Sequence, residues 1–464
     1  MSRDYREWAD SSSAYKHVRQ ANRCLFVLVV CVLFSLIWWK IPHPLLILVL
    51  AILPIGALVV VSVPFYLVLL FVVFSFFRLH EVFPQLYSLK IPLLLSLASM
   101  AGLIWHIGFT KRIQPWWSRE LTLLSIFFTL IALGVIFASN RPIAIEYFKN
   151  IYWKIALMTF AITWLTKSAK DFTFASVLLT CSGVLVSLVA ISNKLNGIGM
   201  VEETRVTIGR AIGSVLGDPN DLALVLMFPA AFAASLALTP GLNKLTRWLG
   251  IISIPVLFFA ILATQSRGGL LGVLAVFGLF FYQRSQNKLV FTGVSVAAGA
   301  LLYVVAGISG RSSGGAGEEG IDASAQGRLY AWEAAWKMAV DNPLSGVGID
   351  NFYSNYFYYS PHWDGLNHAV HSTWFGVLAE SGFLGLLVFT VLIYYLLKLG
   401  YRSLVTLNQM PDAPPILYAC ANASYCGLIG TVVAGTFLTQ GFTWPVYILA
   451  ALSMAVAQWV KRHQ

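Results

Sequence analysis

Residues 373–398 read TWFGVLAESGFLGLLVFTVLIYYLLK. Between Thr373 and Lys398 the only charged side chain in this stretch is Glu380. A helix needs about 20 predominantly apolar residues to cross the hydrocarbon core of a bilayer. The stretch meets that requirement, so it predicts a transmembrane helix.

Similar apolar segments occur along the rest of the chain. Pro54 and Pro64 interrupt two short ones, and one of these two could be re-entrant. The expected fold class is therefore all-α: a polytopic membrane helical bundle of 12–14 transmembrane helices with a partly helical periplasmic loop. The further segments lie near 24–40, 44–59, 62–78, 90–109, 120–138, 151–167, 172–192, 219–238, 246–264, 268–283, 289–306, 417–437 and 440–460.

The composition supports a membrane protein. The chain has 464 residues, of which 58% are hydrophobic and 11% are charged, whereas soluble domains carry about 25% charged residues. Its net charge of +11 does not by itself indicate nucleic-acid binding, because Lys and Arg collect at the cytoplasmic ends of membrane helices.

Placing the N-terminus in the cytoplasm and letting the segments alternate puts more than half of the 31 Lys and Arg on the cytoplasmic side, as the positive-inside rule requires. Both termini are then cytoplasmic. The predicted organisation is a cytoplasmic segment 1–23, a transmembrane bundle 24–306 with a short outer loop 193–218, a large periplasmic loop 307–371, and C-terminal transmembrane helices 372–464.

Cysteines and signal sequences add little. The five cysteines lie in or beside apolar segments without a CxxC pair, which indicates neither a disulfide framework nor a zinc site. The start of the chain lacks a cleavable signal pattern, so the first apolar segment is expected to be retained.

The large outer loop is expected to be partly folded. It opens with a Gly/Ser run, Ser309–Gly317, typical of a flexible linker. A helix-like stretch follows, in which Leu329, Trp332, Trp336 and Ala339 recur at helical spacing. Pro343 predicts that this helix ends just before it, so the loop is expected to lie on the bundle.

Two polar motifs lie at or next to outer loops. The first runs from Ile208 through Arg210 to Gly213-Ser214 and continues as Gly217-Asp218-Pro219-Asn220-Asp221. Asp218 or Asn220 is expected to cap the following helix, and helix N-termini attract anions.

The second motif is Ser266-Arg267-Gly268-Gly269, in a very short outer turn. A charged residue there runs against the positive-inside bias. Its neighbouring glycines would let backbone and guanidinium approach an anion closely.

A third motif precedes the segment quoted first. It reads Asn342-Pro-Leu-Ser-Gly-Val-Gly348 and is followed by His368-Ala-Val-His371-Ser-Thr and by Glu380-Ser-Gly-Phe-Leu-Gly385. The predicted topology puts all three motifs on the same face of the membrane.

Together these motifs resemble the O-antigen ligase and polymerase superfamily over roughly residues 120–460. Their order in the chain is R-x-x-G…D-P-N-D-L-A, S-R-G-G, N-P-x-x-G-x-G…H-S and L-x-E-S-G-x-x-G. The resemblance implies an inverting, metal-independent membrane glycosyltransferase that needs no cofactor. The donor would be a glycan on undecaprenyl diphosphate at the periplasmic face of the bacterial inner membrane. The acceptor would be a hydroxyl, in a ligase that of lipid A-core. Membrane lipid would surround the protein, and no nucleic acid is expected as partner.

Carried over by position, the superfamily's essential histidine falls on His371 and its two essential arginines on Arg210 and Arg267. The chemistry agrees with those positions. Arg is permanently cationic and binds phosphate oxygens bidentately, so the two could stabilise a departing diphosphate. A neutral imidazole can take the proton of the attacking hydroxyl. Weaker candidates for substrate contact are Arg328, Asn220, Ser266 and His368.

Simpler interpretations remain open for several of these residues. Arg210 could be a solvated loop charge, and His371 could merely sit at the lipid interface. His368 and His371 lack the Cys or carboxylate partners of a metal site, so no metal is predicted. Glu380, nine residues after His371, falls on roughly the opposite helical face and is expected to have a structural partner. The aromatic run from Phe352 to Tyr359 indicates an interfacial belt slightly more than a sugar-stacking surface.

Other functions remain as alternatives. The acceptor is not fixed by any residue, and the form H-x-x-H-S, where many members of the superfamily have H-N, leaves open a polymerase or a protein O-glycosylating enzyme. A lipid-linked oligosaccharide flippase or other transporter would place several Arg side chains at the midplane. The scarcity of intramembrane carboxylates other than Glu380 counts against that class. A structural scaffold for envelope assembly would tolerate substitution of Arg210, Arg267 and His371.

Overall fold

The computed structural model describes residues 54–287 and 323–464, together with positions 28, 31, 32, 35, 36, 289, 292 and 293. The chain divides into two compact units, Met1–Pro64 and Phe65–Gln464, and most of the described residues belong to the second unit. The predicted spans 24–40 and 289–306, much of 44–59, and the run Ser309–Gly317 fall largely or wholly outside the described residues.

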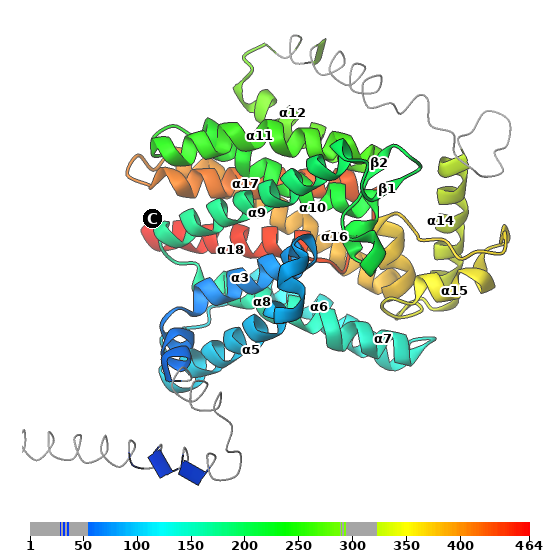
Figure 1. Cartoon of the computed structure of the whole chain (residues 1–464), viewed down its shortest axis with the longest axis horizontal. Coiled ribbons are helices and arrows are strands. Elements are labelled where there is room, and N and C mark those ends of the chain that lie inside the picture. Colours follow the sequence, from blue (N-terminus) through cyan, green and yellow to red (C-terminus); the bar gives the residue numbers. More distant parts are fainter. Residues whose placement is uncertain are drawn as a thin grey trace, which may run out of the picture. The chain divides into compact units, whose positions relative to one another are not determined.

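The described part of the chain is almost entirely helical (Figure 1). A single hairpin of two short antiparallel strands pairs Met200 with Val206. The elements are α3 (Pro64–Phe76), α4 (Leu79–Val82), η1 (Pro84–Leu89), α5 (Ile91–Ile104), η2 (Trp105–Phe109), α6 (Arg119–Phe137), α7 (Arg141–Tyr147), η3 (Phe148–Tyr152), α8 (Trp153–Leu165), α9 (Ala169–Leu195), β1 (Met200–Val201), β2 (Arg205–Val206), η4 (Arg210–Ile212), η5 (Val215–Gly217), α10 (Pro219–Leu238), α11 (Lys244–Thr264), α12 (Arg267–Arg284), α14 (Ala323–Asp341), α15 (Phe352–Tyr359), α16 (Thr373–Asn408), α17 (Pro415–Gly435) and α18 (Trp444–His463).

The all-α polytopic class is confirmed. Within the described residues seven helices are long and apolar enough to cross a membrane. An eighth span is added if Pro54–Ser62 and α3 form one broken span, interrupted at Val63. The break directly precedes Pro64, whereas Pro54 begins the first helix of the pair, so the expected interruption is found at Pro64 and a re-entrant segment stays a prediction. The predicted total of 12–14 includes segments outside the described residues, so that number stays a prediction.

Helix α10 is the centre of the bundle. It packs against α9, α11, α12 and α17, and nearly all its side chains are buried. Its sequence explains this position, because its many Ala and Leu residues give apolar surface on every side, and a helix that is hydrophobic all round belongs in a core.

Small residues let the helices approach closely, as is common in membrane bundles. A Cβ added to Gly250 would come within 2.6 Å of the Ala233 carbonyl oxygen of α10. Gly272 of α12 and Gly430 of α17 face each other in the same way, each close to the other's carbonyl oxygen.

The spanning helices have two distinct ends. At one end lie residues 139–140, 196–218, 265–266, 342–372 and 436–443, which we call the loop end. Contacts between these segments define it: the Ser139 N–H donates to the Val347 carbonyl, Thr204 bonds Gln265, and Thr373 donates to the Leu438 carbonyl. Figure 1 shows α14, α15 and the hairpin gathered here, away from the C-terminus.

The opposite end, which we call the basic end, is rich in cations. Helices that start at the loop end finish at the basic end, and the helices between them start at the basic end. The described Lys and Arg of these first and last turns and connections are Arg119, Lys167, Lys170, Lys244, Arg247, Arg284, Lys461 and Arg462, and Lys398 and Arg402 lie within about the last three turns of α16. The direction of the spans alternates from α6 to α12 and again from α16 to α18. The span 289–306 that alternation requires between α12 and α16 lies largely outside the described residues, so the full alternation stays a prediction.

Helix α14 ends at Asp341, as predicted from Pro343. Of the residues that recur at helical spacing, Leu329 and Trp336 are about half exposed, whereas Ala339 is buried together with Ala334, Ala335 and Met338. The small side chains allow α14 to lie close against the start of α16, to which it makes extensive contact. The loop therefore does fold onto the bundle.

Candidate functional site

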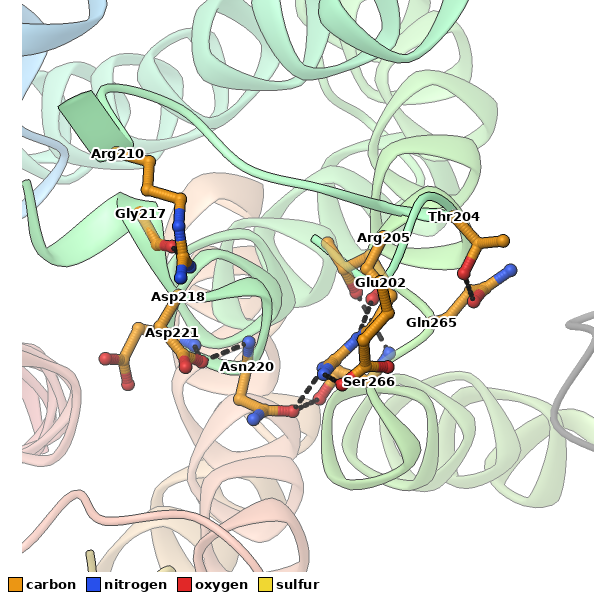
Figure 2. A network of polar contacts seen from close by, with 11 residues as sticks. Glu202, Thr204, Arg205, Arg210, Gly217, Asp218, Asn220, Asp221, Gln265 and Ser266 are labelled. Atoms are coloured by element: carbon orange, nitrogen blue, oxygen red, sulfur yellow. Dashed lines mark hydrogen bonds and ion pairs between the residues drawn. The ribbon is translucent and has the colours of Figure 1, made fainter. Parts of the chain in front are cut away.

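The three sequence motifs meet at the loop end. Figure 2 shows the contacts between the first two. The hairpin β1–β2 and the turn 265–266 are joined by Thr204, which donates to the side chain of Gln265 at 2.9 Å. The third motif is linked to the first because His371 interacts electrostatically with Asp218 and with Arg205, which lies on the hairpin before the first motif.

Arg205, on strand β2, is the buried centre of this network (Figure 2). Its Nε donates to the Thr264 carbonyl at 3.1 Å and its Nη2 donates to Asn220 Oδ1 at 3.0 Å. Glu202 lies 3.8 Å from Nη1. Because these partners belong to the hairpin, α10 and α11, one guanidinium ties three elements together.

Asn220 and Ser266, both proposed from sequence as substrate-binding residues, are hydrogen-bonded to each other. Ser266 Oγ donates to Asn220 Oδ1 at 2.9 Å. Ser266 also caps α12 by accepting from Gly269 N at 3.3 Å. Ser266 is fully buried and Asn220 is partly buried. Their contacts are therefore to protein in this structure, which makes them supports of the turn that carries Arg267.

Asp218 caps α10, as expected, and not Asn220. Its Oδ1 accepts from the backbone of Asn220 at 2.7 Å and of Asp221 at 3.3 Å. Next to it, Arg210 Nη1 donates to the Gly217 carbonyl at 3.1 Å. Arg210 is otherwise exposed on a short 3-10 turn. The guanidinium is thereby held beside the N-terminus of α10 (Figure 2).

Arg267 is the first residue of α12 and is partly buried. The turn before it is only two residues long because Gln265 adopts a left-handed conformation (φ 51°). The glycines after it do not line an open surface. A Cβ on Gly269 would lie 2.4 Å from Ala223 Cβ, and one on Gly268 would lie 2.8 Å from Leu438. These glycines therefore seat the start of α12 against its neighbours, and the anion approach expected from the sequence stays a prediction.

His371 precedes α16 and has a left-handed backbone (φ 44°) that is strained for a non-glycine residue. Its side chain is partly buried. Burial lowers the pKa of His371 below 6.5 and the charge of Arg328 lowers it further, while Asp218 opposes the shift. Arg205 also acts on it. The imidazole is therefore neutral at neutral pH, and charges from the hairpin, α10 and α14 all reach it.

The remaining histidines of this region have structural partners. His368 contacts both carboxylate oxygens of Asp364 at 2.9 and 3.0 Å, and this contact lowers the pKa of Asp364. His362 stacks on Tyr330 with ring centroids 3.8 Å apart. Within the described residues no group of three or more His, Cys, Asp or Glu is arranged to hold a metal ion.

The third motif docks onto a break in α16. Gly382 has φ 70°, which interrupts the helix. The Ala379 carbonyl then accepts from Val347 N at 2.8 Å, and Phe383 N donates to the Pro343 carbonyl at 2.8 Å. A Cβ on Gly346 would meet the Ala379 carbonyl at 2.3 Å, so only glycine fits this contact. The motifs N-P-x-x-G and E-S-G are therefore two halves of one junction.

Glu380 completes this junction. Its carboxylate accepts from the backbone N–H of Phe352 at 3.1 Å, at the start of α15. The neighbouring Asn351 is fully buried and accepts through Oδ1 from the backbone of Asn140 at 3.0 Å. As expected, Glu380 has a structural partner within the fold, and it fixes the loop that leads to His371.

Sequence reasoning missed two contributors to this end of the molecule. Arg205 lies five residues before Arg210 in the same loop and was not singled out, although a second loop arginine was a visible signal. Glu81, after α3, accepts from Ser214 Oγ at 2.5 Å and from Arg78 Nε at 2.9 Å. That contact anchors the first motif from a part of the chain where no motif is visible.

The chain matches the model of a known protein family. Residues 251–390 match the family model described as O-antigen ligase. This region holds Arg267, α14, the third motif, His371 and the first half of α16. No curated protein matches the chain.

Proposed function

We propose, from the match of residues 251–390 to the O-antigen ligase family model and from the helices long enough to span a membrane, that this chain is a multi-pass membrane protein of that superfamily and transfers a glycan from undecaprenyl diphosphate to an acceptor hydroxyl. Lipid A-core is the first acceptor to test, as the ligase reaction implies. The site would be the loop end of the bundle.

The proposed reaction is a single displacement. The acceptor oxygen attacks the anomeric carbon and its proton passes to His371, while the bond from that carbon to the diphosphate oxygen breaks. The configuration at the anomeric carbon inverts, and undecaprenyl diphosphate leaves with the electron pair. A neutral imidazole suits the proton acceptor, and the lowered pKa of His371 keeps it neutral.

Arg267 and Arg210 are proposed to stabilise the diphosphate. Negative charge grows on this group as the bond to the sugar breaks, and a fixed guanidinium offers paired donors to it without a metal. Arg267 is held in place by the buried partners of Ser266, whereas Arg210 lies at the surface, where a lipid-borne substrate can reach it.

The observation that supports this proposal most is the electrostatic link between His371 and Arg205, Asp218 and Arg328. These residues come from four separate segments. The arginines of the first two motifs lie at one end of the bundle, away from the middle of the spans. A transporter would need cationic side chains reachable from both sides, so this arrangement favours a transferase.

Localisation follows as part of the proposal. Basic residues gather at the end opposite His371, and the positive-inside rule assigns such an end to the cytoplasm. We place the loop end, with the site, on the periplasmic side of the bacterial inner membrane, with both termini cytoplasmic.

The test is transfer in vitro. Purified protein receives a defined undecaprenyl diphosphate-linked glycan together with lipid A-core, free glycan or an unfolded protein in parallel reactions, and products are separated by mass. Product on lipid A-core supports the ligase assignment, while product on free glycan or on protein reassigns the acceptor to a polymerase or protein-glycosylating enzyme. Absence of transfer in all three, with movement of the donor across vesicle membranes, would replace the enzyme by a transporter.

A further inference from the structure

The basic end contains a pocket that the proposed reaction does not use. It has a volume of about 340 Å³ and is lined by Arg119, Glu120, Tyr395, Lys398, Leu399 and Arg402. Helices α6 and α16, which form it, pack against each other. The residues of α16 that line it, Tyr395 to Arg402, lie beyond the break at Gly382, whereas His371 precedes the first residue of this helix. It is therefore a separate site.

The basic residues of α16 that line this pocket lie on one face of the helix. Lys398 and Leu399 follow Tyr395 by three and four residues, and Arg402 follows them by four and three, so all four share one face of the helix. Arg119, in the first turn of α6, completes the set from the other side. Three cations oppose the single carboxylate of Glu120, so the pocket carries an excess of positive charge.

Aromatic contacts hold two of the cations in place. Arg119 Nη1 donates to Tyr395 Oη at 3.2 Å, and its guanidinium carbon lies 5.1 Å from the ring centre. Lys398 Nζ lies 5.6 Å from the ring of Tyr394 and 6.0 Å from that of Tyr395. Among the described residues, neither Lys398 nor Arg402 forms an ion pair with a carboxylate. Their charge is therefore available to an anion.

The surroundings place this pocket at the level of lipid headgroups. Trp117, Tyr394 and Tyr401 are each more than half exposed around it, and exposed Trp and Tyr are typical of the membrane–water interface. An anion at this level is presented most directly by a phospholipid.

We propose that this pocket between α6 and α16 binds the phosphate headgroup of an anionic phospholipid. Arg119 and Arg402 have the fork of donors that matches phosphate oxygens, and Lys398 adds a point charge. The lipid would join α6 to α16 at the end opposite the loop end. This inference does not depend on the proposed transferase activity.

The experiment measures lipid retained by the purified full-length protein by native mass spectrometry. The protein is delipidated in detergent and titrated with phosphatidylglycerol or with zwitterionic phosphatidylcholine. We expect phosphatidylglycerol to bind at least about tenfold more tightly, since each basic residue near an anionic headgroup contributes severalfold to affinity. Equal binding of the two lipids by the unmodified protein would overturn the proposal without recourse to any variant.

The double substitution Lys398→Gln with Arg402→Gln removes two of the three cations while keeping side-chain length. It should lower the affinity for phosphatidylglycerol about tenfold or more. The matched control is Lys461→Gln with Arg462→Gln, which removes two charges from the last turn of α18 at the same end and should leave the affinity within about twofold. An unchanged affinity in the first variant, or an equal loss in both, would contradict a defined pocket.

A third arm separates a lipid from a soluble anion. Inorganic phosphate at millimolar concentration is added to the complex with phosphatidylglycerol. Retention of the lipid supports recognition of a membrane-borne headgroup, because its acyl chains add apolar contact that free phosphate lacks. Displacement of the lipid by phosphate would overturn the lipid assignment in favour of a soluble anion.

Discussion

Asn220 Oδ1 receives two hydrogen bonds, one from Arg205 Nη2 at 3.0 Å and one from Ser266 Oγ at 2.9 Å. A side chain in the first turn of α10 thus connects the hairpin to the turn that carries Arg267. This relationship explains why motifs far apart in sequence occupy one end of the bundle.

The connection predicts a large effect of Arg205→Gln. Hydrogen bonds from a charged group to Thr264 and Asn220 are lost in a buried place, and such bonds contribute about 1.5–3 kcal/mol each. The free energy of unfolding in detergent should fall by about 2 kcal/mol or more, with loss of transfer activity. Arg247→Gln, in the first turn of α11 at the basic end, is the control and should leave both unchanged. A variant at position 205 as stable as the control would contradict the network.

The close packing at the start of α12 predicts that alanine substitutions of two glycines in this helix have different effects on stability. Gly269→Ala places a Cβ 2.4 Å from Ala223 Cβ, so the start of α12 must shift and the free energy of unfolding should fall by roughly 1–3 kcal/mol. Gly278→Ala meets no atom within 4 Å, and alanine favours helix, so stability should be unchanged or slightly raised. Chemical unfolding of both variants measures this, and equal effects would refute the packing argument.

Much of the architecture could be predicted from the sequence because membrane spans leave a strong signal. Long apolar segments, the basic turns between them and the proline after Asp341 each have a direct physical cause. The cap of α10 by Asp218 also follows from local chemistry, whereas the partner of Glu380, the Phe352 N–H, lies 28 residues away in the sequence.

Other features depend on contacts distant in sequence. Arg205 and Glu81 carry no motif, and their importance comes from partners in α10, α11 and the first outer loop. The packing of Gly268 and Gly269 against Leu438 and Ala223 could not be seen locally either. The packed face of α14 also depends on a distant partner, because its small residues fit against α16.

The junction at Phe352 predicts that an acceptor, and not a charge, is needed at position 380. Glu380→Ala removes the partner of the Phe352 N–H, and leaving a buried donor unpaired costs about 1–3 kcal/mol. Because the loop to His371 would loosen, kcat should fall more than donor affinity. Glu380→Gln keeps a carbonyl acceptor and should restore most of both stability and kcat. If the Glu380→Gln variant were as inactive as Glu380→Ala, the negative charge itself would be required and the prediction would be wrong.

Arg328 predicts a shift in the pH dependence of transfer. The base must be neutral, so activity should fall as pH drops through the pKa of His371, which lies below 6.5 in the fold. Arg328→Gln removes a charge that lowers this pKa, so the acid limb of kcat/KM should move to higher pH. Lys337→Gln, further along α14 and paired with Glu333, is the control and should leave the limb in place. A limb that moves to lower pH in the Arg328 variant would contradict the assignment.

The guanidinium at position 267 should not be replaceable by an amine. Arg267→Lys keeps the charge but loses the paired donors, so kcat for transfer should fall at least about tenfold. Arg284→Lys, at the other end of the same helix, is the matched control and should retain activity. Equal activity of the two variants would remove Arg267 from the diphosphate site.

The central claim is that His371 takes the acceptor proton beside a diphosphate held at the loop end, and transfer by His371→Ala tests it most directly. The account predicts a loss of about 10²-fold or more in kcat, with donor affinity and stability retained, while His362→Ala in the same loop stays active. Transfer by His371→Ala at the rate of the unmodified protein would contradict the account.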